Sequence, residues 1–283
     1  MSMEFELRAG VDNYAVMGNP VGHSLSPRIH HAFADQTGEL LYYQSILVEL
    51  DGFAAALARF QERGGRGLNI TVPFKQEAWT AVDVRTDRAG QAGAVNTVWF
   101  GEDRRRHGDT TDGTGLVRDL QRHSVGLAGR RVLILGAGGA VRGVLGELLK
   151  QRPAALCIAN RTRSKAEILI RAFPTQVDTQ ALGFDELPAA GAFDVIINAI
   201  PAGLTTELPD LPPDLLADDG CCYDMVYGAD NTPFVAWGKE HGARLALDGL
   251  GMLVEQAAES FYIWRGVRPE TEPVIDMLRN SKQ

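Results

Sequence analysis

Short apolar runs alternate with helix-like segments over the first hundred residues, a pattern typical of a sheet covered by helices. Four runs predict strands, at residues 14–17, 42–48, 67–70 and 94–100. Between the second and third runs, Phe53, Leu57 and Phe60 recur at helical spacing, and Asp51 precedes them as the expected N-cap. The first part of the chain is therefore predicted to be an α/β domain.

The later part of the chain opens with a buried strand, a glycine turn and a helix. The apolar run 131–135 leads directly into Gly136, and a helical pattern extends from the glycine turn to about Lys150. Strands are then predicted at 155–159, 194–198, 221–226 and near 243–246, with a helix near 163–173. Buried strands separated by helices indicate a mostly parallel sheet.

Two further segments complete this pattern. Four prolines, at positions 201, 209, 212 and 213, predict a loop before the last long strand. From Gly249 onward, apolar residues at positions 253, 257, 261 and 264 recur every three or four residues, so a C-terminal helix is expected.

Composition narrows the class of protein. A chain of 283 residues is long enough for two ordinary domains. Its net charge of −8 argues against a general nucleic-acid or membrane surface, and the basic run at 104–106 between two glycines indicates a solvated turn rather than a polyanion site. The three cysteines, Cys157, Cys221 and Cys222, offer no disulfide framework, and no segment has the length of a signal peptide core or a membrane span. A cytoplasmic protein is expected.

The glycine turn is a candidate dinucleotide site. N–H groups at the start of the following helix can bind a pyrophosphate, and Gly136, Gly138 and Gly139 let that phosphate approach closely. Val141 stands where the usual motif has its third glycine or alanine. The alternative at this point is that the strand, turn and helix bind no ligand.

The end of the next strand indicates which dinucleotide binds. NAD sites carry a carboxylate here for the ribose 2′-hydroxyl, whereas this chain has none between Asn160 and Lys165. Arg161 and Lys165 bring positive charge, and Asn160 and Thr162 bring neutral polar groups, which suits the 2′-phosphate of NADP. The alternative is a solvated basic helix start, but cations at a helix N-terminus oppose the helix dipole.

Other polar residues follow strands of the first domain, where α/β sheets usually hold ligands. Ser24 and Ser26 come after the first strand and can bind a carboxylate, although Ser26 before Pro27 also predicts an ordinary helix cap.

Strand alternation places Asn69 and Thr71 on one face. Lys75 begins a helix, where the dipole disfavours its charge, and a surface lysine is the competing interpretation. Asn96 and Asp112 come from two further turns.

Five sequence blocks occur in a fixed order along the chain, and together they are highly specific. They are GNPVGHSLSP, NITVPFK, AGAVNT, GAGGA with NRTRSK, and YDMVYG followed by DGLGMLVEQAA. Over nearly its whole length the chain resembles the shikimate dehydrogenase family. The resemblance implies an N-terminal α/β substrate domain of residues 1–112, completed by C-terminal helices at 250–283. It also implies a Rossmann-type, doubly wound NADP domain of residues 113–249.

The resemblance also implies the reaction and the residues that carry it. NADPH would reduce 3-dehydroshikimate reversibly to shikimate, a step in chorismate and aromatic amino acid biosynthesis. Lys75 and Asp112 would form the catalytic pair, Ser24 and Ser26 would hold the substrate carboxylate, and Tyr227 would close over the substrate. Ring hydroxyls would be bound by Asn69, Thr71, Asn96, Asp112 and Gln256. The implied cofactor residues are Gly136, Ala137, Gly138, Gly139, Ala140, Asn160, Arg161, Thr162, Lys165, Ala199, Met225 and Gly249.

Two positions depart from the family pattern. Thr110 precedes Thr111 where the family often has asparagine, and Ile200 is apolar where threonine is commoner, which is expected to weaken a polar contact near the cofactor. The nearest rival is a quinate/shikimate dehydrogenase using NAD, which the basic NRTRSK run disfavours. A second rival is a member that senses NADP without catalysis, which the presence of Lys75 and Asp112 disfavours.

The remaining expectations concern partners and the histidines. We expect a monomer or homodimer acting on a small molecule, without nucleic acid, membrane or metal. His23, His30 and His31 are expected to be structural or at the surface.

Overall fold

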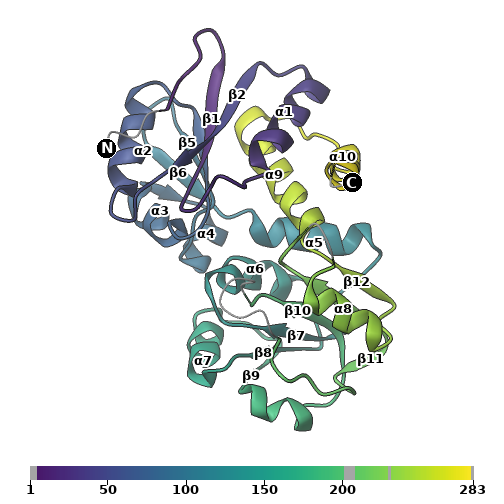
Figure 1. The fold of residues 1–283 in the computed structure, drawn as a ribbon. Helices are drawn as coiled ribbons and strands as arrows, with labels where there is room; N and C mark the ends of the chain where they lie inside the picture. The colour runs from purple at the N-terminus through teal and green to yellow at the C-terminus, as the bar shows by residue number, and fades with distance from the viewer. Residues whose placement is uncertain (1–4, 201–207, 229–230, 282–283) are drawn as a thin grey trace. The chain divides into compact units, whose positions relative to one another are not determined.

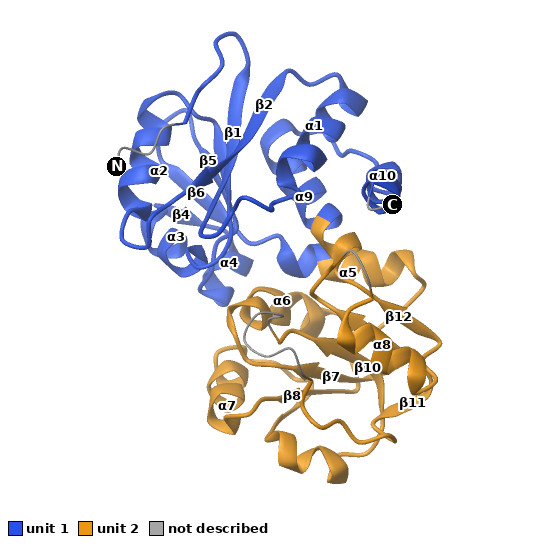
Figure 2. Ribbon diagram, in the orientation of Figure 1, with its two compact units in different colours: residues 1–115, 254–283 blue, residues 116–253 orange. Residues whose placement is uncertain are grey.

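The structure, a computed structural model, describes residues 5–200, 208–228 and 231–281 (Figure 1). It contains two compact units, one of residues 1–115 with 254–283 and one of residues 116–253 (Figure 2). The division falls within two helices, α5 (Asp112–Arg122) and α9 (Leu250–Arg265). Within the described residues, no helix is long and apolar enough to cross a membrane.

The first unit contains a mixed sheet whose strand order brings several strand ends to one edge. The order is β2 (Leu41–Leu47), β1 (Asp12–Gly18), β3 (Gly67–Ile70), β5 (Thr97–Phe100), β6 (Arg106–Asp109) and β4 (Val84–Arg85). Strand β5 is antiparallel to both β3 and β6, whereas β1 is parallel to β2 and β3. The start of β5 therefore lies at the same edge as the ends of β3 and β6.

The helices of this unit bury apolar faces. Helix α2 (Phe53–Glu62) buries Phe53, Leu57 and Phe60, as their spacing predicts, and each such side chain contributes about 1.5 to 3 kcal/mol by leaving water. The other helices of the first unit are α1 (Ser26–Thr37), α3 (Lys75–Ala81), α4 (Asp87–Ala92) and α10 (Glu272–Asn280). Indole Nε1 of Trp264, on α9, donates to the backbone oxygen of Val98 at 3.1 Å, which joins the C-terminal helix to this unit as expected.

The second unit contains an all-parallel sheet. Its order is β12 (Leu245–Leu247), β11 (Leu216–Asp224), β10 (Phe193–Asn198), β7 (Arg131–Leu135), β8 (Ala155–Ala159) and β9 (Asp178–Leu182). Counted along the chain this is the 3-2-1-4-5-6 order of a Rossmann fold, with its switch point between β7 and β10. The accompanying helices are α6 (Gly139–Lys150), α7 (Arg163–Arg171), α8 (Pro233–Glu240) and the 3₁₀ turn η1 (Phe184–Ala189). The predicted two-domain α/β fold class is confirmed.

Several local predictions were wrong. Helix α2 is preceded by Gly52 rather than capped by Asp51, and Ser26 is the first residue of α1, after Leu25, with no side-chain cap bond at either helix. The strand predicted from residue 94 begins at Thr97, because Gly93 in the left-handed conformation ends α4 just before it. Arg106, expected in a solvated turn, begins β6.

Other elements were not predicted at all. Strand β4 has only two residues, and in β9 all side chains are half-buried or exposed, so neither contains an apolar run. Helices α4, α5, α8 and α10 were also missed. In the proline-rich connection, residues 201–207 lie outside the described residues, and residues 208–213 form no helix.

Candidate active site

The predicted substrate residues of the first unit come together at one edge of its sheet. Ser24 and Ser26 follow β1, Thr71 and Lys75 follow β3, and Asp112 follows β6. Asn96 immediately precedes β5, which runs in the opposite direction, and Gln256 reaches the same side chains from α9. The antiparallel strand β5 is what brings residues from separate turns into one place.

Lys75 and Asp112 form the central ion pair. The Lys75 Nζ donates to the Asp112 Oδ2 at 2.6 Å, and the side chains are 25% and 10% exposed. The other oxygen, Oδ1, accepts from the Asn96 Nδ2 at 2.9 Å. A carboxylate bonded through both oxygens has a fixed plane, so the Lys75 ammonium group is held at a defined position.

The orientation of the Asn96 amide is set by its neighbours. Its Oδ1 accepts from the backbone N–H of Thr111 at 2.9 Å, a contact that only an oxygen can make. Its Nδ2 therefore faces Asp112, the hydroxyl of Thr111 at 2.9 Å and the Oε1 of Gln256 at 3.3 Å. Asn96, Thr111 and Gln256 together orient the Lys75–Asp112 pair; Thr111 was missed by sequence reasoning.

The two serines lie at the start of α1. The Ser24 Oγ accepts from the backbone N–H of Ser26 at 3.3 Å, Ser26 is buried and Ser24 is half-buried. Nearby, a Cβ at Gly18 would lie 2.3 Å from the Thr71 Cγ2, so only glycine allows this approach of the two segments. The turns carrying Ser24 and Thr71 are thereby packed together.

A second missed group of residues holds the strand that leads into this edge. Arg88 donates to both carboxylate oxygens of Asp109, at 2.7 and 2.6 Å, and also contacts Thr114 at 2.8 Å and Glu259 at 3.2 Å. The Asp109 Oδ1 also accepts from the backbone N–H of Thr110 at 2.7 Å. One guanidinium thus ties α4, β6, α5 and α9 around the turn that ends at Asp112.

Asn69 was predicted to bind a ring hydroxyl, yet its amide already has internal partners. Its Oδ1 accepts from the Tyr43 hydroxyl at 2.7 Å and lies 3.1 Å from the His30 Nε2. Its Nδ2 donates to the backbone oxygen of Asn96 at 3.2 Å and to the Ser260 Oγ at 3.0 Å. His30 was expected to be structural or at the surface and is buried, whereas Tyr43 was not singled out from sequence. The available signal was that His30 lies four residues after Ser26, on the same helix face.

Buried His30 makes stability depend on pH. Burial lowers its pKa from 6.5 to about 3, and the neighbouring His31 charge adds to the effect while the hydrogen bond to Asn69 opposes it. Because the folded pKa lies below the unfolded one, the unfolded chain binds the extra proton. The contribution of neutral His30 to the free energy of unfolding is therefore complete above pH 6.5 and is lost as the pH falls from 6.5 toward 3.

We expect about 2 kcal/mol of unfolding free energy to be lost between pH 7 and pH 5 from this group, at 1.36 kcal/mol for each pH unit below 6.5. Urea unfolding at the two pH values measures it. The His30→Gln variant keeps an amide donor but cannot protonate, so it should lose less. An equal loss in both proteins would contradict the role of His30.

In the second unit the glycine turn lies at the switch point of the parallel sheet. Gly136 has φ of 106°, and a Cβ there would lie 3.2 Å from the backbone oxygen of Ala199, at the end of β10. A Cβ at Gly138 or Gly139 would meet nothing within 4 Å, and residues 138–140 are exposed. Ala137 is half-buried beside them. The start of α6 is therefore open to a ligand such as a phosphate.

The basic segment after β8 separates into paired and unpaired cations. Arg163 pairs with Glu186 at 2.6 Å and Glu167 at 3.1 Å. Arg161 and Lys165 are exposed and have no ion pair among the described residues. The Asn160 Nδ2 donates to the backbone oxygen of Thr162 at 2.9 Å, which holds the turn. Two cations are thus available for an anionic group.

Met225 and Gly249 are brought together at the end of β11. A Cβ at Gly249 would lie 2.4 Å from the backbone oxygen of Met225, so this approach requires glycine. Tyr227 is half-buried two residues later, and burial raises the pKa of its phenol, which stays protonated at neutral pH. Ala199, Met225 and Gly249 all lie at carboxyl ends of parallel strands, where such sheets bind ligands.

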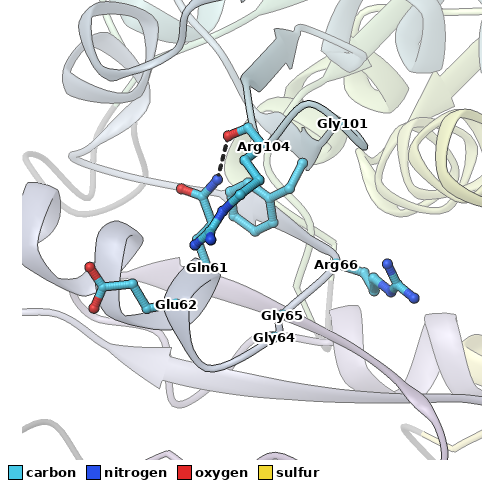
Figure 3. A pocket seen from close by; sticks show the side chains of 8 residues that line it. Gln61, Glu62, Gly64, Gly65, Arg66, Gly101 and Arg104 are labelled. Carbon is cyan, nitrogen blue, oxygen red and sulfur yellow. Dashed lines mark hydrogen bonds between the residues drawn. The ribbon is translucent and has the colours of Figure 1, made fainter.

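A separate hollow lies in the first unit between two turns (Figure 3). It is lined by residues around Gly64 and Gly65 and by residues of the β5–β6 turn, and the Gln61 Nε2 donates across it to the backbone oxygen of Arg104 at 2.7 Å. None of the predicted site residues lines this hollow.

Comparison with known proteins covers most of the chain. Residues 16–98 match the shikimate dehydrogenase substrate binding domain, residues 119–205 match shikimate / quinate 5-dehydrogenase, and residues 249–279 match the shikimate 5′-dehydrogenase C-terminal domain. The shikimate dehydrogenase (NADP(+)) of Alkalilimnicola ehrlichii is 60% identical over 269 residues, which are 95% of this chain and 98% of that protein.

Solved structures also resemble this chain over most of its length. The Ael1 enzyme from Pseudomonas putida is 45% identical with a TM-score of 0.88, over 94% of this chain and 98% of that chain. Shikimate 5-dehydrogenase from Thermus thermophilus, solved with NADP(H) and shikimate, is 30% identical with a TM-score of 0.84. That match covers 96% of this chain and all of that chain.

Proposed function

The chain belongs to the shikimate dehydrogenase family, and from that premise we propose that it catalyses the NADPH-dependent reversible reduction of 3-dehydroshikimate to shikimate. It is an NADP-dependent oxidoreductase acting on a small-molecule substrate. The pairing of Lys75 with Asp112 at 2.6 Å carries the proposal, because it places an ammonium donor at the edge where the other polar residues gather.

The residues of the second unit suit NADP. The open start of α6 at residues 138–140 offers N–H groups to a pyrophosphate, and the exposed Arg161 and Lys165 offer charge to a 2′-phosphate. Gly136, Ala137, Asn160, Thr162, Ala199, Met225 and Gly249 complete the proposed contacts. When bound, NADPH supplies the hydride that reduces the ketone carbon.

Lys75 and Asp112 supply the proton. As the hydride reaches the carbonyl carbon, negative charge develops on the carbonyl oxygen, and the pair delivers one proton to that oxygen. Asp112, bonded to Asn96 through its second oxygen, keeps the Lys75 Nζ in place. In the reverse direction the same pair takes the proton from the substrate hydroxyl.

The other residues would position the substrate. Ser24 and Ser26 are proposed to bind its carboxylate, and Thr71 and Gln256 its ring hydroxyls, with Tyr227 closing over it. Asn69 and Asn96 were assigned ring hydroxyls on resemblance, and their internal hydrogen bonds favour a supporting part instead. The domain limits of 1–112 with 250–283 and 113–249 remain our proposal for the substrate and cofactor domains.

Assaying the purified protein tests the function. Shikimate and quinate would each be offered with NADP and with NAD, and the formation of the reduced cofactor would be followed by its absorbance. Shikimate with NADP should give the highest kcat/KM. Faster turnover of quinate with NAD would reverse the assignment, and no turnover with any combination would favour a member that only binds NADP.

Arg161→Ala tests the cofactor assignment. Losing a charged hydrogen bond worth about 1.5 to 3 kcal/mol should weaken NADP affinity by roughly 10- to 100-fold. Titration of NADP by calorimetry measures this. Arg163→Ala is the matched control, since Arg163 is already paired with Glu186 and Glu167 and should change the affinity little. Unchanged affinity in Arg161→Ala would remove that residue from the site.

We propose a cytoplasmic location and a monomer or homodimer. Three cysteines, Cys157, Cys221 and Cys222, are free and buried, as suits a reducing compartment. Sedimentation analysis would distinguish the two assembly states.

A further inference from the structure

Three side chains from different elements meet in the interior beside the serines. His30 comes from α1, Tyr43 from β2 and Asn69 from β3, and they are 0%, 1% and 6% exposed. The His30 and Tyr43 rings stack with centroids 4.3 Å apart and planes 6° apart. Both rings reach the same atom, the Asn69 Oδ1.

The direction of each hydrogen bond follows from one fixed partner. The Asn69 Nδ2 lies 3.2 Å from the backbone oxygen of Asn96, which can only accept, so Oδ1 faces the two rings. Tyr43 therefore donates its hydroxyl proton, and His30 carries its proton on Nε2. The Asn69 oxygen accepts two hydrogen bonds, and its amide hydrogens are directed to Asn96 and Ser260.

This group joins the two segments proposed to bind substrate. Ser26 lies one helical turn before His30 on α1. Thr71 follows Asn69 by two residues at the end of β3. Three apolar residues could fill the same interior without the desolvation of buried polar groups, whereas directional bonds set the spacing of the two segments.

We propose that His30 and Tyr43 are positioning residues that, through Asn69 and helix α1, set the spacing between the carboxylate-binding serines and Thr71. The proposal rests on the proposed function and deepens it. Asn69 is the acceptor that His30 and Tyr43 share, and its amide oxygen and nitrogen are hydrogen-bonded to other groups of the protein. The Lys75–Asp112 pair makes no side-chain hydrogen bond to His30 or Tyr43.

Steady-state kinetics of Tyr43→Phe test this. The variant keeps the ring that stacks on His30 and loses only the hydroxyl. KM for shikimate should rise about 5- to 10-fold, the effect of one neutral hydrogen bond, with kcat within about twofold and KM for NADP unchanged. Tyr42→Phe is the matched control, because Tyr42 is the preceding residue of the same strand and its ring contacts Arg8. It should behave as the wild type.

His30 gives an independent arm. His30→Gln retains an N–H donor near the position of Nε2 and should stay within about threefold of the wild-type KM, whereas His30→Leu should resemble or exceed Tyr43→Phe. In Ser26→Ala, adding Tyr43→Phe should raise KM by less than it does in the wild type, because part of its effect is exerted through the placement of Ser26.

Three results would overturn the proposal. One is an unchanged shikimate KM in Tyr43→Phe. Another is KM values that simply multiply in the double variant. The third is a parallel loss of kcat, of affinity for shikimate and of affinity for NADP in Tyr43→Phe and His30→Leu, with the same loss in His30→Gln. That result would mean that His30 and Tyr43 have a structural role only. Failure of the wild type to oxidise shikimate with NADP would instead refute the proposed function, so the two failures are distinguishable.

Discussion

Replacing Lys75 by alanine is expected to lower kcat for shikimate oxidation by at least about 100-fold, the low end of general acid–base contributions. The variant removes the Nζ that donates to Asp112 at 2.6 Å and leaves no other lysine or arginine hydrogen-bonded to that carboxylate among the described residues. The proton then has to be exchanged with water, and the developing oxyanion loses its charged donor.

Steady-state rates with saturating shikimate and NADP measure this loss. Gln76→Ala is the control, since Gln76 is the next residue of α3 and is exposed. Asp112→Asn is informative beside it, because it keeps the shape of the side chain and removes the charge that holds Lys75. Comparable losses in the two variants would mean that the pair acts as one unit.

A Lys75→Ala enzyme with near-normal kcat would exclude Lys75 from the mechanism. A rise in KM with kcat unchanged would mean that Lys75 only binds substrate. Either result would leave the family membership intact and require another proton donor.

Arg88→Ala is expected to lower the unfolding free energy of the first unit by about 3 kcal/mol, the lower end for breaking a buried ion pair. The Asp109 carboxylate, 4% exposed, would lose both bonds from the guanidinium and keep those from Thr86 and the Thr110 N–H. Arg88 is itself 22% exposed and Glu259 keeps Arg268, so the upper end of the range is not expected.

Urea unfolding followed by tryptophan fluorescence suits this test. Three of the four tryptophans, Trp79, Trp99 and Trp264, lie in the first unit. With a slope of about 2 kcal/mol per M, the midpoint should fall by about 1.5 M. Arg88→Lys should recover only part of the loss, because lysine cannot donate in a fork to both oxygens.

Arg66→Ala provides the surface comparison within the same unit. Arg66 is 64% exposed and pairs with Asp12 at 2.9 Å, so its loss should change stability by less than about 1 kcal/mol. Equal midpoints for Arg88→Ala and the wild type would show that the Asp109 group does not hold the first unit together.

Elements with strong local signals could be predicted from the sequence. The runs at 67–70, 131–135 and 155–159 became strands β3, β7 and β8 with the predicted bounds, because each is mostly apolar and bounded by residues that end strands. Helix ends were less predictable. Asp51 and Ser26 have side chains that can cap a helix, but the N-cap position of α2 is Gly52 and that of α1 is Leu25, one residue away in each case.

Elements whose formation depends on partners could not be predicted. Strand β9 has no fully buried side chain, and it exists because β8 offers it a ladder from Ala155 to Ala159. Strand β6 contains Arg106 and His107, which no apolar pattern marks, and it forms by pairing with β5. In both cases the neighbouring strand supplies what the local sequence lacks.

For the candidate site, the sequence by itself determined which chemical groups are present and where in the chain they lie. These are hydroxyls at the start of α1, an ammonium at Lys75, a carboxylate at Asp112 and cations after β8. Only the tertiary structure decided which of them meet. Lys75 and Asp112 are 37 positions apart in the sequence and are brought together by β5, which runs antiparallel to its neighbours. Local periodicity does not contain strand direction. Likewise, Asn69 faces inward to His30 and Tyr43 because three elements converge there, and such a long-range contact is a property of the packed chain.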